Sequence, residues 1–137
     1  MPAARLAGDR SGGASVEFAI VALALFLMLF AIIELGRLAA ADSALSYAAG
    51  VAARYAAVHG SSSASPASSA TIAAQFAAAA APVLGSAAPT PTVTFSPNNN
   101  PGSIVTVAAS YAWSPVSMKG DFAAVTLSTA STLVIEH

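Results

Sequence analysis

The sequence has no cysteine and very little charge. The absence of cysteine from its 137 residues excludes disulfide scaffolds, thiolate metal sites and cysteine nucleophiles. Charged residues make up 8% of the chain, whereas they make up about 25% of an ordinary soluble domain. The five basic residues are spread along the chain and do not form the basic patch that nucleic-acid binding requires. We therefore expect no nucleic-acid partner.

Patterns that carry catalysis are missing as well. The two histidines, His59 and His137, have no metal-ligand spacing to each other or to acidic residues. No serine stands in a Gly-x-Ser-x-Gly motif, and the chain has neither a glycine-rich phosphate loop nor a dinucleotide fingerprint. We expect no enzyme activity, cofactor or metal. Lys119 and Asp121 are expected to be surface residues of a turn.

Apolar residues are abundant by contrast, and they are concentrated near the start of the chain. Hydrophobic residues make up 56% of the sequence, and its mean hydropathy is +0.71. The run Phe18–Ile33 contains no charged or polar side chain and is bounded by Glu17 and Glu34. With its small flanking residues, the run can cross a hydrocarbon core of about 30 Å at about 1.5 Å per residue. We predict a leader over 1–12 and a transmembrane helix over 13–36.

Two other interpretations of this run compete with a membrane anchor. One is the buried helix of a soluble protein, and the other is a cleaved signal peptide with Arg5 and Arg10 before the run and Ala39–Ala41 as the cleavage site. The run slightly exceeds the usual apolar region of about 7–15 residues in a signal peptide. In addition, Glu34 and Arg37 would lie between it and the cut. These features favour an uncleaved anchor.

The flanks of the span indicate its orientation and its continuation. Arg5 and Arg10 precede it, so the positive-inside bias favours a cytoplasmic N-terminus and an exported C-terminal part. Residues 3–65 contain no proline, so we expect the helix to run on to about Val58. Residues 37–59 are then its extracytoplasmic continuation.

Two side-chain patterns are expected on this long helix. Glu34 and Arg37 are i,i+3 neighbours that can pair at the membrane surface, an interaction that contributes about 0.2–0.5 kcal/mol. Beyond them, mostly small residues fall at spacings of four and three on one helical face. They are Ala44, Ala48, Val51, Tyr55 and Val58. This stripe can receive a partner helix or the protein's own C-terminal part.

The remainder, residues 60–137, is expected to be an exported α+β part. A serine-rich linker over 60–69 leads to an alanine-rich helix over Thr71–Ala81, with Pro82 at its end. Period-two segments rich in Val, Thr and Ile then predict strands at Thr92–Ser96, Ile104–Trp113 and Val125–Ile135. Tyr111 and Trp113 share one strand face and are expected in a core or an interface. The fold class is α+β, with a small antiparallel sheet of three or four strands that one or both helices must cover.

The start of the span carries the most specific motif. Gly12–Phe18 reads Gly-x-x-x-x-Glu-Phe, directly after the polar leader and directly before the apolar run. Here the chain resembles prepilin-type proteins, in which a membrane peptidase cuts after the glycine. Cutting after Gly12 would leave Gly13 as the new N-terminus, with Glu17 as the fifth residue. A carboxylate near hydrocarbon is costly unless it is paired, and the family's assembly implies that a neighbouring subunit's α-amino group is the partner.

Further along, Glu34-Leu35-Gly36-Arg37 and the segment around Arg54 and Tyr55 resemble TadE/TadF-like minor pseudopilins of tight-adherence (Tad or Flp) pilus systems. The resemblance covers roughly Gly12 to Val58. It implies a pilin-like fold and a structural role in pilus assembly or related secretion, by helix packing. It also implies a single-pass protein of the bacterial inner membrane that can enter the pilus.

The resemblance also implies partners and sites. The partners are a TadV-like prepilin peptidase, TadF-like and other minor pilins, the major Flp pilin, the Tad inner-membrane platform proteins and membrane lipid. The implied processing residues are Gly12, Gly13, Glu17 and Phe18. The implied membrane-boundary and assembly residues are Glu17, Glu34, Arg37, Arg54 and Tyr55. The alternative function is a membrane-anchored exported binding or adhesion module that does not assemble with pilins.

Overall fold

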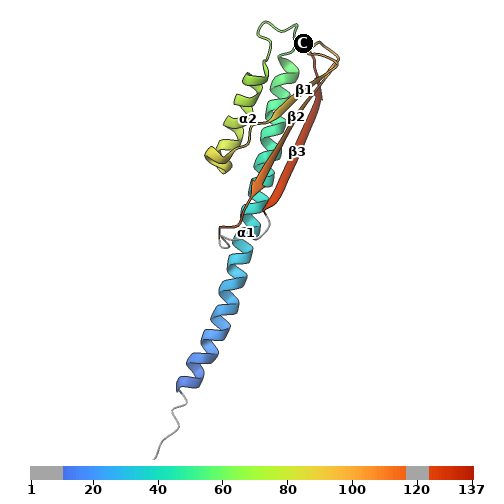
Figure 1. The fold of residues 1–137 in the computed structure, drawn as a ribbon. Helices are drawn as coiled ribbons and strands as arrows, with labels where there is room; N and C mark the ends of the chain where they lie inside the picture. The colour runs from blue at the N-terminus through green and yellow to red at the C-terminus, as the bar shows by residue number, and fades with distance from the viewer. Residues whose placement is uncertain (1–10, 117–123) are drawn as a thin grey trace, which may run out of the picture.

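The computed structural model describes residues 11–116 and 124–137 (Figure 1). In chain order the elements are α1 (Ser11–Val58), α2 (Ser69–Leu84), the 3-10 turn η1 (Gly85–Ala87), β1 (Thr92–Ser96), β2 (Ile104–Trp113) and β3 (Val125–Val134). This order confirms the predicted α+β class. Arg5 and Arg10 of the predicted leader lie outside the described residues, as do Lys119 and Asp121, which were predicted to lie in a turn.

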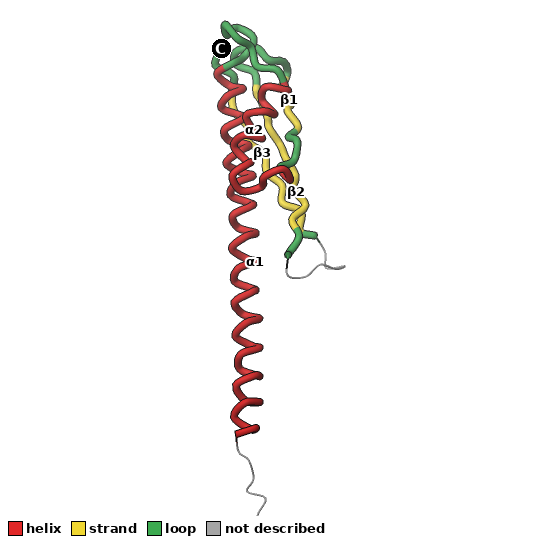
Figure 2. Tube along the Cα trace, turned by 90° about the vertical axis from the view of Figure 1, so that its left-hand side faces the viewer, coloured by secondary structure: helices red, strands yellow, loops and turns green. Residues whose placement is uncertain are grey.

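One helix, α1, runs through most of the length of the molecule. Its 48 residues span about 70 Å at about 1.5 Å per residue, and it ends at Val58 as predicted. Figures 1 and 2 show that its first part stands alone, while α2 and the sheet lie along its second part. We call residues 12–37 the bare half of α1 and residues 38–58 the covered half. The covered half and everything described after it form the head.

The bare half presents its large apolar side chains outward on all sides. Their exposed fractions run from 45% at Leu29 to 75% at Phe18. Two described helical segments are long and apolar enough to cross a membrane, Gly12–Val58 and Ser69–Ala87. The second lies beside the covered half of α1 and contributes buried residues to the head. Along most of its length, therefore, no other described part of the chain packs against the bare half.

The three strands form one antiparallel sheet in the order β1-β2-β3. Two strands have the predicted limits, and β3 ends at Val134, one residue before the predicted end. Side chains alternate between the two faces of the sheet along β2. Val105 and Val107 are buried on one face, and Thr106 lies on the other face. On that outer face Thr106 lies opposite Thr94 and Thr132, and it exchanges a hydroxyl hydrogen bond of 3.1 Å with Thr132.

Helix α2 is longer than the predicted Thr71–Ala81 at both ends. It begins at Ser69 because Ser68 and Thr71 form a capping box that satisfies the first backbone N–H groups. It also continues through Pro82, so the prediction that this proline ends the helix was wrong. A proline inside a helix lacks the N–H for one backbone hydrogen bond and crowds the carbonyl of the preceding turn, but the burial of Leu84 in the core stabilises the turn that contains Pro82. The helix ends at Gly85, whose φ of +56° suits glycine.

The core of the head is made of small residues on α1 and large residues facing them. Nine buried positions of α1 are alanines or leucine, and they form the broad buried face of the covered half. They are Ala41, Ala44, Leu45, Ala48, Ala49, Ala52, Ala53, Ala56 and Ala57. Large fully buried side chains come from the other elements and include Phe76, Ile72, Val105 and Val107. Both helices therefore contribute to the core that the sheet closes.

The predicted stripe on α1 faces the protein's own chain for part of its length. Ala44 and Ala48 are buried, Val51 and Tyr55 are half-buried, and Val58 is 43% exposed. Of the two partners considered for this stripe, the structure supplies the C-terminal part. The buried face is centred on alanines that the stripe did not include, because the head covers α1 from two sides, by α2 and by the sheet.

The distal end of α1 is closed by the last residues of the chain. The Glu136 N–H donates to the Ala57 carbonyl at 2.9 Å, and the Ile135 N–H donates to the Ser103 carbonyl at 2.8 Å. The chain passes so close to Gly60 that a Cβ there would overlap the His137 carbonyl oxygen and the Ile135 side chain. Only glycine fits at this crossing without movement of the backbone.

Candidate functional site

The residues of the processing motif lie in the first turns of the bare half. Gly12 and Gly13 are already helical, and a Cβ at either position would meet no atom within 4 Å. Glu17 is exposed, and Phe18 is the most exposed large apolar side chain of the bare half. One helical turn separates residue 13 from Glu17, about 6 Å along the axis. The described chain leaves this end of α1 accessible to another protein.

Glu34 ties the end of the bare half to the head. Its Oε2 accepts a 2.7 Å hydrogen bond from Arg37 Nη1, which confirms the expected pairing of these two residues. Its Oε1 accepts a 2.9 Å bond from the backbone N–H of Val116, just after β2. The carboxylate is only 15% exposed, whereas the Arg37 side chain is 44% exposed. Glu34 therefore binds both the arginine and the segment that follows the C-terminal end of β2.

Sequence reasoning could not find the third member of this cluster. Val116 donates through its backbone and lies 82 residues from Glu34, so no side-chain pattern marks it. The strand alternation did place Tyr111 and Trp113 on one face, and that face meets α1 near Arg37. The length of β2, ten residues, was the one feature of the sequence that could have indicated this contact, because a strand of that length can extend along α1 as far as Arg37.

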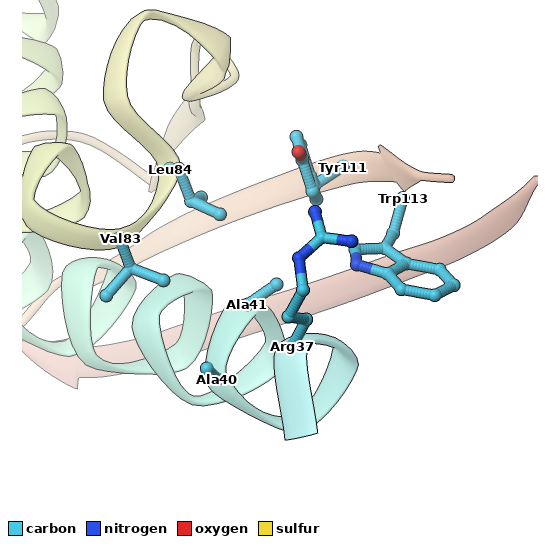
Figure 3. Close-up of a pocket in the computed structure, with 7 residues that line it drawn as sticks. All are labelled: Arg37, Ala40, Ala41, Val83, Leu84, Tyr111 and Trp113. Carbon is cyan, nitrogen blue, oxygen red and sulfur yellow. The ribbon is translucent and has the colours of Figure 1, made fainter. Parts of the chain in front are cut away.

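Arg37 stands between two hollows. A cavity of about 130 Å³ is lined by its side chain together with Ala40, Ala41, Val83, Leu84, Tyr111 and Trp113. Figure 3 shows the Arg37 guanidinium extending toward Tyr111 and Trp113. A second hollow of about 310 Å³ lies toward the bare half of α1 and is lined by Phe30, Ile33, Glu34, Arg37 and Val116. The same guanidinium therefore borders one cavity of mixed polarity and one that is mostly apolar.

The other two predicted assembly residues lie higher on α1. Arg54 is exposed, and the next residue, Tyr55, is half-buried against the core. The Tyr55 ring stacks on the His59 ring with centroids 4.2 Å apart, and His59 Nδ1 lies 2.9 Å from the Tyr55 carbonyl oxygen. Seventeen residues separate Arg54 from Arg37, which is about 25 Å along the helix.

The predicted site residues thus occupy three levels of α1 instead of one site. Glu17 lies near the start of the bare half, the Glu34–Arg37 pair lies at its end, and Arg54 with Tyr55 lies in the covered half. In the described parts of the chain, no three His, Asp or Glu side chains gather as a metal site would require. The predicted residues are therefore distributed along one helix, from its exposed start to the part that packs in the head.

Comparison with known proteins points to the same part of the chain. The family model for TadE-like proteins matches residues 12–54. The match confirms the resemblance over the bare half and most of the covered half, which is under half of the chain. It stops before the linker, α2 and the sheet. No curated protein and no solved structure matches the chain.

Proposed function

We propose that this chain, TadE-like over residues 12–54, is a membrane-anchored minor pilin or pseudopilin of Tad (Flp) pilus assembly or a related secretion system. The observation that carries this proposal is the division of α1. A single helix joins an uncovered apolar half to a half that is built into a small α+β head. This is the construction that a subunit needs in order to be held in a membrane and to pack with others through the same helix.

The first support is the exposed apolar surface of the bare half. Fourteen large apolar side chains between Val16 and Leu35 are at least 45% exposed. Soluble monomers rarely expose contiguous apolar patches above a few hundred Å², so this surface requires lipid or other helices. The bare half is the span that crosses the bacterial inner membrane, with the N-terminus cytoplasmic and the head extracytoplasmic.

The second support weighs against a signal peptide. The alternative cleavage site, Ala39–Ala41, lies inside unbroken α1, and Ala41 is buried in the core of the head. A cut there would open the core and would remove Glu34, which binds the Val116 N–H. An uncleaved α1 keeps the helix and the head as one folded unit.

Processing and assembly follow from the accessible end of α1. A TadV-like peptidase cuts after Gly12, which leaves the α-amino group of Gly13 at the start of the helix. Glu17 pairs with the α-amino group of a neighbouring subunit, and this pairing offsets the cost of a carboxylate near hydrocarbon. The bare half then packs against the helices of TadF-like and other minor pilins, the major Flp pilin and the Tad platform proteins.

The test is to replace Glu17 with alanine in the native cell. We expect lost piliation, measured by electron microscopy and by pilin in the sheared fraction, while the protein stays in the carbonate-resistant membrane fraction. Asp42→Ala is the matched control, because Asp42 is an exposed carboxylate on the same helix. Unchanged piliation in the Glu17 variant would contradict the assembly role of this residue.

Two further measurements separate the parts of this proposal. Mass spectrometry of the protein from native membranes should find Gly13 at the N-terminus, whereas an intact Met1 or a start at Asp42 would contradict processing after Gly12. Co-purification with the major Flp pilin or a TadF-like protein is expected for a pilus component. A membrane-anchored adhesion module would instead retain a ligand and leave the pilins behind.

A further inference from the structure

The two hollows beside Arg37 follow one another along α1 and change in character. The hollow of about 310 Å³ is lined by Phe30 and Ile33, at the end of the apolar run. The other begins one turn further, at Ala40, and includes Tyr111 and Trp113. Arg37 lines both. An apolar slot and a cavity lined by a cation, a phenol and an indole therefore lie on two sides of the same arginine.

Their depth matches the border between hydrocarbon and water. From Glu17 to Arg37 the helix rises about 30 Å at about 1.5 Å per residue, which is the thickness of a hydrocarbon core. If the bare half spans the membrane, Arg37 lies at the level of the lipid headgroups. Trp and Tyr are enriched at this level in membrane proteins because their rings are apolar and their N–H or O–H groups are polar. Trp113 and Tyr111 occupy the corresponding position in this protein.

The Glu34 carboxylate binds Arg37 while the Arg37 guanidinium extends toward Tyr111 and Trp113 of the cavity (Figure 3). Glu34 accepts one bond from Arg37 Nη1 and another from the Val116 N–H. A guanidinium carries five N–H donors in a planar fork that fits phosphate oxygens. Because the Arg37 side chain remains 44% exposed despite the Glu34 bond, its outer edge can present further donors to an incoming anion.

We propose that these two hollows form one phospholipid site. The phosphodiester of the headgroup binds the Arg37 guanidinium beside Trp113 and Tyr111, and one acyl chain lies in the slot between Phe30, Ile33 and Val116. Glu34 is a positioning residue that holds the arginine and the end of β2. The site rests on the proposed membrane anchoring, and it adds a defined lipid contact that fixes the height and rotation of the head above the bilayer.

The chain contains a single tryptophan, Trp113, so its fluorescence reports on this site alone. The full-length protein, purified in a mild detergent, is titrated with phosphatidylglycerol, and the emission of Trp113 is followed. We expect a saturable change. Diacylglycerol with the same acyl chains lacks the phosphate and should give no saturable change, and inorganic phosphate alone should give none over the same range.

Three variants locate the binding. Arg37→Gln should weaken the apparent affinity for phosphatidylglycerol about tenfold or more, because a charge-assisted bond to phosphate is lost. Arg54→Gln removes an exposed cation from the head and should bind as the wild type does. Val116→Phe keeps Arg37 but fills the apolar slot. Val116 is 61% exposed, so the larger side chain does not have to enter the core of the head. This variant should also weaken binding.

Several results would overturn the lipid site. They are unchanged binding by Arg37→Gln, equal binding of diacylglycerol, or saturation by inorganic phosphate alone, which would indicate a simple anion site. The thermal unfolding of each variant is measured to confirm that its head is folded. The outcome is independent of the Glu17→Ala piliation test, since a chain that assembles into pili without a lipid site would fail only the titration.

Discussion

The two halves of α1 are equally helical but differ in what surrounds them and in the size of their side chains. In the bare half, the large residues Phe, Leu, Ile and Met point outward on every side. In the covered half, the buried positions are alanines apart from Leu45, and most of them are completely buried. One continuous helix therefore carries two kinds of apolar surface.

Side-chain size accounts for the difference. Lipid chains adapt to any outline, so large apolar residues suit a helix that faces hydrocarbon, and they need no specific packing. Alanine lets the backbones of α2 and the sheet approach α1 closely, but each alanine buries little area. The hydrophobic stabilisation of the head must therefore come mostly from the opposite side, from residues such as Phe76, Ile72 and Val107.

The largest expected effect tests this division with one phenylalanine from the head, on α2, and one from the bare half of α1. Phe76→Ala removes a fully buried ring from the alanine-lined core and should lower the free energy of unfolding of the head by about 3–5 kcal/mol. Phe26→Ala, in the bare half, should leave it unchanged, because that ring does not contact the head core. Chemical denaturation followed by Trp113 fluorescence measures both. Equal losses would contradict the division.

A smaller effect is expected from adding volume to each half. Ala49→Leu places three extra carbon atoms where no space is open, so we expect a loss of about 1–3 kcal/mol in the stability of the head. Ala24→Leu makes the same change in the bare half, where Ala24 is exposed, and should have no effect on the head. If Ala49→Leu also left the stability of the head unchanged, close packing against α1 would not explain why the buried positions of the covered half are alanines.

Two glycines extend the comparison to the backbone. Gly60→Ala introduces a Cβ into the crossing with Ile135 and His137, so the last residues must move. We expect a loss of about 1–3 kcal/mol and faster amide exchange at Glu136, whose N–H bonds the Ala57 carbonyl. Gly36→Ala meets no atom within 4 Å and should strengthen α1 by about 0.5–1 kcal/mol. A stable Gly60→Ala with protected Glu136 would contradict the crossing.

Periodicity was sufficient to locate the main elements. The absence of proline from residues 3–65 predicted that α1 continues to about Val58, and the period-two pattern of Val and Thr predicted the limits of β1 and β2. Both signals depend on local sequence. Pro82 misled the prediction for α2 because its local preference was overruled by the burial of Leu84, a tertiary contact that the sequence does not display.

The site was predictable only where its residues are neighbours in the chain. Glu34 and Arg37 are three residues apart, so helical geometry alone implied their pairing. The approach of Val116 and Trp113 to the same pair depends on how β2 lies along α1, over a sequence separation of about 80 residues. Gly60 was missed for the same reason, since its neighbours are at the end of the chain.

The smallest expected effect lies at the boundary between the two halves. Glu34→Gln keeps an oxygen for the Val116 N–H but removes the charge that pairs with Arg37. We expect a loss of about 0.2–0.5 kcal/mol that disappears in concentrated salt, because an ion pair with a partly exposed arginine is screened. Glu34→Ala also removes the acceptor for Val116 and should cost more than Glu34→Gln at every salt concentration. If the two variants were equal, the backbone bond to Val116 would contribute nothing, and only the ion pair would mark the boundary between the bare half and the head.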